Sequence, residues 1–471
     1  MTRVHAFADD ALGDDDAVGL AERLAAGEVS AAELASAAVA RAGRVDAQLR
    51  AIAVPYDQPR YASDATGALA GVPTYVKDNV DLAGLPTQNG SSAYTASPAT
   101  RDGNFAKQFL ATGVTVLGKT RLPEFGLNAS TEYSADEPCR NPWHTDFSVG
   151  ASSGGAAALV AAGVVPIAHA NDGGGSIRIP AACTGLVGLK PTLGRLVDSE
   201  ATRFMPVNIV SEGVVTRTVR DTAAFLAAAE RYRRNPRLAP IGRVLGPAQR
   251  TLRIGIQLES PTGATIDAET RAAVERTATA LERAGHIIEQ ADIPVTTEFV
   301  DDFVRYWGLL ADLATTTGKV ALHRSWNSSR ADGLTRGLRD HHRRSLHRIP
   351  TSLKRLHAVR HAYAESFTRH DVVLSPVLSH LTPRLGHLSP TVPFDELIDR
   401  LITYVSFTPL HNVAGAPAIS LPAGLSTDGL PVGVQLSTAR GDERTLLELA
   451  YLLEAEQPFP TIHDRERSKV G

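Results

Sequence analysis

The pattern of apolar positions predicts helices and strands in alternation over most of the chain. Apolar residues at helical spacing predict helices at 16–27, 30–49, 104–112, 155–163 and 267–284. Short apolar runs predict strands at 50–56, 71–80, 114–118, 164–170, 252–257, 287–288 and 371–377. Because the two kinds of element alternate, we expect an α/β fold in which helices cover a sheet.

The second half of the chain differs in composition from the first. Residues 252–288 predict a strand, an amphipathic helix and a second strand, which is a βαβ-like unit. Residues 298–370 are rich in Arg and His and predict mainly helix, and strands and a final helix follow within 412–454. Since no repeat or low-complexity linker divides the chain, we expect a single domain over 1–471, with a helical excursion at 298–370.

Composition narrows the class of protein. The chain has 471 residues, with 48 Lys and Arg against 51 Asp and Glu, a formal charge of −3 that argues against a dedicated nucleic-acid binder. Its two cysteines, Cys139 and Cys183, exclude a disulfide scaffold and suit a reducing compartment such as the cytoplasm. The first 16 residues contain no apolar run, so we expect no signal peptide. No stretch of about 18 apolar residues predicts a membrane span.

Two glycine-rich segments that carry serines are the candidates for chemistry. The first, at 150–155, places Ser152 and Ser153 directly before an Ala-rich helix, where N–H donors and positive potential are available. The second follows a predicted strand and places Gly173, Gly174 and Gly175 before Ser176. Successive glycines allow several backbone N–H groups to point at one position, which is what an oxyanion hole requires.

A serine nucleophile needs a base, and Lys77 is the candidate. No histidine lies in either glycine segment, although His169 is close to the second. Lys77 lies in an apolar strand, and burial lowers the pKa of a lysine because it disfavours the ammonium form. A decrease from about 10.4 to roughly 7.5 requires about 4 kcal/mol of differential destabilisation, which a buried position supplies.

These segments resemble the amidase signature family. The resemblance rests on GVPTYVKDNVDLAG from Gly71, on GASSGGAAALVAAG from Gly150 and on DGGGSIRIPAACTGLVGLKPT from Asp172. The spacing also agrees, with Ser176 lying 24 residues after Ser152 and 99 after Lys77. Weaker similarity covers most of the rest of the chain and is least in 298–370.

The resemblance implies a large mixed β-sheet flanked by helices on both faces, and a Ser–Ser–Lys triad. In such a triad Ser176 attacks the carbonyl and is acylated. Ser152, preceded by a cis peptide bond at Ala151–Ser152, bridges Ser176 and Lys77. The backbone N–H groups of Gly173, Gly174, Gly175 and Ser176 bind the oxyanion.

The same resemblance assigns supporting roles to Ser153, Asp172 and Arg178, with Arg178 paired to Asp172. It implies hydrolysis of small aryl or alkyl amides, with ester and carbamate (urethane) side activity, and neither a cofactor nor a metal. We expect small-molecule substrates, no nucleic-acid or membrane partner, and a monomer or homodimer.

This sequence departs from the family pattern at three positions. Ala151 stands where glycine is usual, Asn171 where Thr or Ser is usual, and Gly173 where Thr or Ile is usual. None of these changes removes a predicted catalytic side chain. These changes affect the expected shape of the acyl pocket. The three consecutive glycines resemble the corresponding segment of some nylon-oligomer hydrolases and aryl or alkyl amidases.

Other interpretations of the same residues stay open at this stage. Ser152 alone suits a helix N-cap, Lys77 alone suits a strand lysine paired with Asp78, and the glycines suit a tight turn. The segment 150–154 also satisfies G-x-S-x-G, which predicts Ser152 as the nucleophile, with Asp and His partners downstream.

The basic segment 336–361 is predicted to be a solvated helical face rather than a site for polyanions or membranes. Its histidines lack the spacing of a metal site. We expect the excursion to wall the acyl or leaving-group pocket, with Tyr306, Trp307 and Trp326 supplying aromatic surface or core packing.

The alternative function is the glutamine amidase subunit of a tRNA-dependent amidotransferase, which also belongs to this family. Against it, Ile-Arg-Ile-Pro180 follows the predicted nucleophile where those subunits more often carry Gln before the proline. A non-catalytic scaffold is disfavoured because all three triad residues are present.

Overall fold

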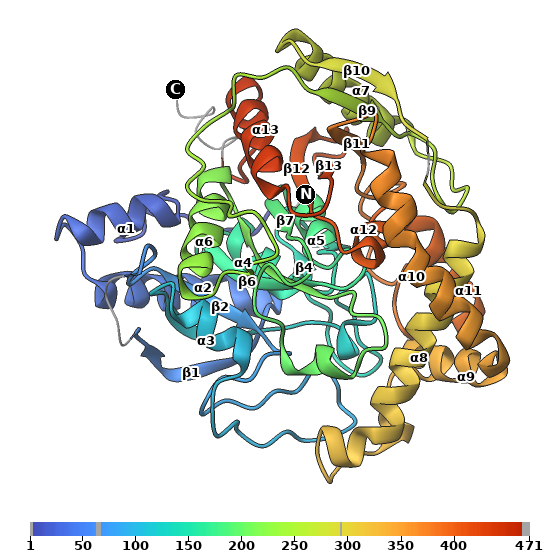
Figure 1. The fold of residues 1–471 in the computed structure, drawn as a ribbon. Coiled ribbons are helices and arrows are strands. Elements are labelled where there is room, and N and C mark those ends of the chain that lie inside the picture. The colour runs from blue at the N-terminus through green and yellow to red at the C-terminus, as the bar shows by residue number, and fades with distance from the viewer. Residues whose placement is uncertain (1–2, 63–66, 293, 464–471) are drawn as a thin grey trace.

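The computed structural model describes residues 3–62, 67–292 and 294–463. Within these ranges eight strands form one large mixed sheet in the order β10-β9-β11-β13-β12-β7-β8-β6. A three-stranded sheet, β1-β3-β2, lies at the β6 edge of the large sheet, where β2 contacts β6, and β4 and β5 form a separate ribbon. Figure 1 shows the helices arranged around this core.

The large sheet changes from parallel to antiparallel pairing along its width. Strands β10, β9 and β11 are parallel, and each following pair is antiparallel. The strands are β1 (Ile52–Arg60), β2 (Pro73–Lys77), β3 (Thr115–Thr120), β4 (Arg140–Asn141), β5 (His144–Ser148), β6 (Ile167–Asp172), β7 (Val187–Lys190), β8 (Ser211–Thr216), β9 (Arg253–Ile256), β10 (Ile287–Gln290), β11 (Val372–Pro376), β12 (Ala418–Leu425) and β13 (Pro431–Thr438).

Helices cover both faces of the large sheet, as the alternation along β13 makes clear. A Cβ at Gly433 would lie 2.6 Å from Ala182 of α5, whereas Val434 and Leu436 belong to the core that includes Leu446 of α13. Helix α13 contacts both α6 and α7, and the three helices form the layer opposite α5. The predicted α/β architecture, a mixed sheet with helices on both faces, is therefore confirmed.

The helices are α1 (Ala17–Ala25), α2 (Ala31–Leu49), α3 (Asn104–Leu110), α4 (Gly154–Ala161), α5 (Arg178–Thr184), α6 (Val219–Tyr232), α7 (Ala268–Arg283), α8 (Glu298–Ala321), α9 (Gly333–Arg344), α10 (Ile349–Ser366), α11 (Phe394–Tyr404), α12 (Pro409–Ala414) and α13 (Glu443–Glu456). Every residue of α4 is buried, as expected for a helix that is apolar on all sides.

Most elements lie within a few residues of their predicted positions. The Ser30–Glu33 capping box begins α2, and β9, α7 and β10 form the predicted βαβ unit with parallel strands. The strand predicted at 164–170 is displaced, because β6 runs on through Asn171 and Asp172. Helices α5 and α6 and strands β7 and β8 were not predicted. Helix α5 is only seven residues long, too short for a periodic pattern to stand out.

Residues 298–370 form α8, α9 and α10, so the predicted helical excursion is observed (Figure 1). The basic side chains of 336–361 are mostly exposed, and two of them pair with acids of α8. Arg343 lies 2.8 Å from Asp312, and Arg355 lies 2.5 Å from Asp302. These ion pairs agree with a solvated helical face.

Candidate active site

Lys77 is the last residue of β2, and its side chain is fully buried between the two sheets. Its Nζ atom lies 2.7 Å from Ser152 Oγ, 3.0 Å from Ser153 Oγ and 2.7 Å from Asn171 Oδ1. The structure thus brings together two predicted site residues and the predicted base. It adds Asn171, which the sequence marked only as a departure from the family pattern.

In its neutral form the Lys77 amine has two N–H groups and one lone pair, and the three contacts can use all of them. Asn171 Oδ1 can only accept, so one N–H points there. The Ser153 hydroxyl lies 3.3 Å from the Asn171 carbonyl, to which it donates, so its oxygen accepts the second N–H. The lone pair of Nζ is left for the hydroxyl hydrogen of Ser152.

Electrostatics agree with a neutral Lys77. Burial lowers its pKa from 10.5 to about 7, and the carboxylates of Glu212 and Asp172 oppose that decrease. A second buried lysine, Lys190, also has a pKa lowered to about 7 by burial. Its Nζ atom, however, contacts the Pro191 carbonyl at 2.9 Å and not a predicted nucleophile. Position, rather than pKa alone, therefore distinguishes Lys77.

The segment that carries Ser152 is closely packed. The Ala151–Ser152 peptide bond is cis, as predicted. Gly150 has φ +76°, and a Cβ there would lie 2.8 Å from Pro180 Cα, so the close approach of α5 requires glycine. On the other side, a Cβ at Gly126 would lie 3.0 Å from Ser152 Oγ.

Ser176 lies half-buried in the loop between β6 and α5. Among the described residues its hydroxyl makes no hydrogen bond, so the predicted link from Ser152 to Ser176 is not formed. Hydrogen bonds between catalytic groups are often long before a substrate is bound. The Ser176 hydroxyl is left available to an incoming group.

Asp172 holds this loop in shape. Its carboxylate accepts from the N–H groups of Gly175 at 2.6 Å and Ile177 at 3.2 Å. It also accepts two hydrogen bonds from Arg178, at 2.8 and 3.0 Å, which is the pairing that the resemblance implied. Burial alone would raise the pKa of Asp172, but the Arg178 guanidinium holds it well below its usual range.

Arg178 connects the loop to the C-terminal part of the sheet. It donates to Gln435 Oε1 and Asn412 Oδ1 at 2.7 Å each, and to His411 Nδ1 at 3.2 Å. Asn412 in turn donates to Asp172 Oδ1 at 2.9 Å. The sequence alone had assigned no role to any of these partners.

One of the predicted oxyanion donors is engaged elsewhere. The N–H of Gly175 donates to Asp172 Oδ1 at 2.6 Å and is therefore already occupied. The corresponding groups of Gly173, Gly174 and Ser176 make no such bond to Asp172. Gly175 has φ +136°, and a Cβ there would collide with the Thr408 hydroxyl, so this position requires glycine for backbone shape.

Apolar side chains approach the glycine loop. A Cβ at Gly174 would lie 3.4 Å from Phe303 Cζ of α8, and one at Gly173 would lie 3.2 Å from Val210 Cγ2. The Thr408 hydroxyl donates to the Gly174 carbonyl at 2.6 Å. Phe303, Val210 and Thr408 were not predicted, since nothing in their local sequence marks them.

The aromatic residues predicted for the pocket have different positions. Tyr306 is buried and its hydroxyl bonds to Val207, so it packs in the core. Trp307 is half-buried, with its ring 6.1 Å from that of Phe303. Trp326 packs 5.8 Å from Phe125, the neighbour of Gly126 beside Ser152. The excursion thus reaches the glycine loop through Phe303, and Trp307 packs beside Phe303.

The contacts of Ser152 argue against the G-x-S-x-G interpretation, in which histidine is the base. His169 does not reach Ser152. Its Nδ1 atom accepts from the backbone N–H of Lys77 at 3.1 Å, and its Nε2 atom faces Glu212 at 2.9 Å. In the described ranges no group of three or more His, Cys, Asp or Glu side chains could hold a metal ion.

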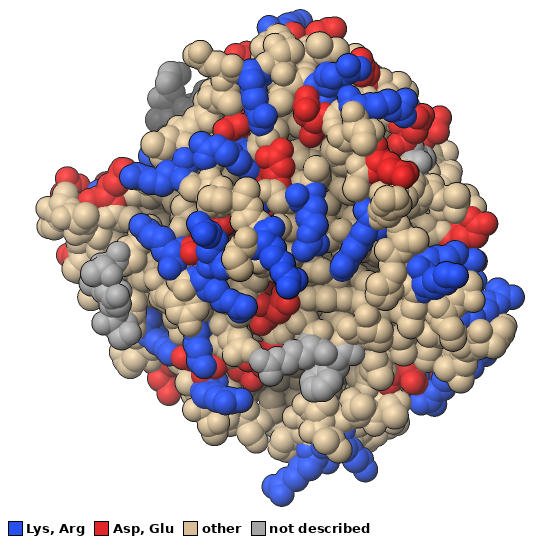
Figure 2. All heavy atoms as spheres, viewed as in Figure 1, with Lys and Arg blue, Asp and Glu red and all other residues tan. Residues whose placement is uncertain are grey.

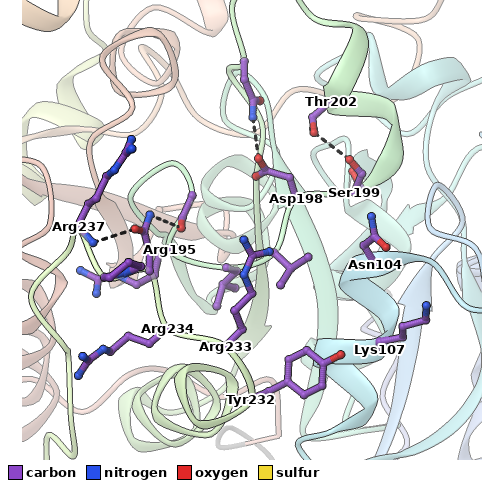
Figure 3. A pocket seen from close by; sticks show the side chains of 16 residues that line it. Asn104, Lys107, Arg195, Asp198, Ser199, Thr202, Tyr232, Arg233, Arg234 and Arg237 are labelled. Atoms are coloured by element: carbon purple, nitrogen blue, oxygen red, sulfur yellow. Dashed lines mark hydrogen bonds between the residues drawn. The ribbon is translucent and has the colours of Figure 1, made fainter.

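A polar hollow of about 800 Å3 lies elsewhere, and none of the predicted catalytic residues lines it. Figure 3 shows Lys107, Arg233, Arg234 and Arg237 around it, with Asp198 accepting from an asparagine. Figure 2 shows Lys and Arg mixed with Asp and Glu across this side of the molecule. Its open, charged lining differs from the enclosed surroundings of Lys77.

Comparison with known proteins identifies the family of this chain. The amidase family model matches residues 30–447. "Putative amidase AmiC" of Mycobacterium leprae is 49% identical over 467 residues, which cover 98% of this chain and 99% of that protein. The structure of 6-aminohexanoate cyclic dimer hydrolase has a TM-score of 0.84 at 29% identity, covering 95% of this chain and 97% of that one. A bacterial aryl acylamidase has a TM-score of 0.83 at 27% identity, covering 96% and 98%.

The chain belongs to the amidase signature family. It is an amide hydrolase whose substrates are small molecules. Over the part of the chain that the structure describes, no helix is both long and apolar enough to span a bilayer.

Proposed function

We propose that this enzyme hydrolyses small amides of aryl or alkyl carboxylic acids through an acyl-enzyme on Ser176. The observation that carries the proposal is the buried contact of 2.7 Å between Lys77 Nζ and Ser152 Oγ, beside the Ser176 loop. A low-pKa amine in hydrogen-bond contact with a serine is a base that can act near neutral pH.

In the first half of the reaction, Ser176 Oγ forms a bond to the carbonyl carbon. Its proton passes to Ser152 Oγ as the Ser152 proton passes to Lys77 Nζ. The carbonyl oxygen, now negative, is stabilised by the free N–H groups of Gly173, Gly174 and Ser176. The C–N bond then breaks, and the leaving nitrogen takes the proton back from Lys77 through Ser152.

In the second half, water attacks the ester carbonyl of the acyl-enzyme. Lys77 removes a proton from this water through Ser152, and the proton then returns to Ser176 Oγ as the C–O bond breaks. The carboxylic acid leaves, and all three side chains regain their starting protonation states. Asp172 and Arg178 take no proton and hold the loop in place.

The choice of substrate rests on Phe303, Val210 and Trp307. Apolar side chains near the glycine loop before Ser176 favour substrates with uncharged acyl or amine groups. The names of two relatives, a cyclic dimer hydrolase and an aryl acylamidase, agree with such substrates. Esters and carbamates present a comparable carbonyl, so we propose weak activity on both.

A substrate panel tests the proposal. Aryl anilides, alkyl amides, peptide amides, esters and aryl carbamates are assayed with wild type and with Phe303→Ala. We expect anilides and alkyl amides to be the better substrates. Phe303→Ala should raise the KM for anilides while esters of acetic acid are less affected. Preference for charged amides would contradict the substrate class, and absence of carbamate cleavage would remove the urethanase activity.

We also propose that the enzyme acts in the cytoplasm as a monomer or homodimer. Both cysteines are buried and unpaired, which suits a reducing compartment. Gel filtration of a native lysate tests the assembly. A stable complex with a different protein, together with glutamine hydrolysis, would instead favour an amidotransferase subunit.

A further inference from the structure

His169 joins two sheet edges that do not pair through their backbones. Strand β2 is at one edge of the three-stranded sheet, and β6 is at one edge of the large sheet. An edge strand presents unpaired N–H and C=O groups. Here the N–H of Lys77 on β2 donates to His169 Nδ1 on β6 at 3.1 Å. The Thr74 hydroxyl makes a second bridge, to the Ile167 carbonyl at 2.8 Å.

These contacts determine the tautomer of His169. Because Nδ1 accepts a hydrogen bond, the ring hydrogen is on Nε2, which donates to Glu212 Oε2 at 2.9 Å. Burial lowers the pKa of His169 and Glu212 opposes that decrease, and the imidazole is neutral because its Nδ1 lone pair is occupied.

The orientation of the imidazole is fixed from several sides. In the antiparallel pair β6–β8, Asn171 lies opposite Glu212, so His169, Asn171 and Glu212 share one face of the sheet. The rings of Phe105 and Phe109 pack against His169, with centroids at 4.7 and 5.8 Å. His169 and Glu212 are both buried, so neither exchanges its partner for water.

We propose that His169 and Glu212 are positioning residues for the base Lys77. His169 fixes the backbone of Lys77 relative to β6, which carries Asn171 and leads into the Ser176 loop. Glu212 fixes the His169 tautomer whose Nδ1 accepts from the Lys77 backbone N–H. The negative charge of Glu212 also stabilises the ammonium form of Lys77. The inference rests on the proposed role of Lys77, and neither residue touches the reacting atoms.

The charged groups around His169 and Glu212 determine how a substitution should shift the pH at which Lys77 becomes neutral. Lys77 is near the carboxylates of Glu212 and Asp172, both of which raise its pKa. His169 is near Lys119 as well as Lys77. The Glu212 carboxylate also raises the pKa of Asp198 by charge repulsion. Since Glu212 stabilises the Lys77 ammonium, removing its charge makes Lys77 neutral at a lower pH.

Two isosteric variants of His169 separate positioning from packing. In His169→Asn, the amide oxygen occupies the region of Nδ1 and still accepts from Lys77. In His169→Gln, the amide reaches toward Nε2 and still donates to Glu212, but no acceptor is left for Lys77. We expect kcat on an anilide to stay within about 3-fold of wild type for His169→Asn and to fall about 10- to 100-fold for His169→Gln, since small misplacements are costly. KM should change less than about 2-fold in both.

Glu212→Gln tests the charge, because the amide oxygen still accepts from His169. We expect the acid limb of the kcat/KM profile to move toward lower pH by roughly half to one unit. Asp198→Asn, in the polar hollow, is the matched control and should move it less.

Three outcomes are decisive. If kcat of the two His169 variants follows their melting temperatures, His169 only packs and the inference is wrong. If Glu212→Gln leaves the acid limb in place, the role of the Glu212 charge is wrong. If Lys77→Ala retains full amide turnover, the proposed function itself fails, which separates that failure from the other two.

Discussion

Asn171 Oδ1 accepts a hydrogen bond from Lys77 Nζ at 2.7 Å. Asn171 also accepts from Asn79 Nδ2 at 3.3 Å, and its backbone lies directly before Asp172. One residue therefore links the predicted base to the loop of the predicted nucleophile. Because an amide oxygen only accepts, it directs an N–H of Lys77 away from Ser152 and leaves the lone pair for Ser152.

Substitution of Asn171 should change the pH dependence of kcat/KM only where the new side chain is charged. Asn171→Asp places a carboxylate against Lys77, which stabilises the ammonium and moves the acid limb of kcat/KM to higher pH. Asn171→Thr keeps an uncharged acceptor and should leave the limb within about 0.3 units of wild type. Profiles from pH 5 to 9 measure both variants. An unchanged limb in Asn171→Asp would mean that Lys77 is not the titrating base.

Wild-type activity should depend on the neutral form of Lys77. Its pKa is lowered to about 7, so the neutral fraction grows as pH rises through that value. We expect kcat/KM to fall about tenfold per unit well below pH 7 and to level off above it. A profile that is flat from pH 5 to 9 would contradict a lysine base.

Ser176→Ala should abolish amide turnover, because it removes the hydroxyl of the proposed nucleophile. We expect a loss of at least about 10⁴-fold, with a melting temperature close to wild type because Ser176 is half-buried and makes no hydrogen bond among the described residues. Mass spectrometry after treatment with a fluorophosphonate should locate the label on Ser176. A label on Ser152 would instead support the G-x-S-x-G interpretation.

Lys77→Ala should impair amides more than esters. An amine leaving group needs a returned proton, whereas an alcohol or phenol leaves more readily without one. We therefore expect the ratio of ester to amide kcat/KM to rise at least about tenfold in this variant. Matched anilide and phenyl ester substrates give the ratio. Equal losses on both would show that Lys77 does not return the proton.

Arg178→Met should destabilise the protein. The change leaves the Asp172 carboxylate buried without its cation, which typically costs about 3–5 kcal/mol. Denaturant unfolding should show a lower midpoint. The double variant Asp172→Asn/Arg178→Met removes the uncompensated charge and should recover part of the loss. No recovery would mean that the pair contributes through packing alone.

The sequence by itself located the candidate catalytic segments and much of the fold. Lys77, Ser152 and Ser176 lie in motifs that are long enough to be specific, and the capping box at Ser30 and Glu33 is a local signal that α2 satisfies. Local patterns of this kind depend on neighbours within a few residues, so they can be recognised along the chain.

Only the tertiary structure decided how Lys77, the proposed base, is held. His169 and Glu212 are 43 residues apart and meet because β6 and β8 pair, and Phe303 reaches the glycine loop from a helix more than 100 residues away. The engagement of Gly175 by Asp172 likewise depends on the shape of the folded loop. Such contacts arise from strand pairing and helix packing between distant segments, and no periodicity in the sequence encodes them.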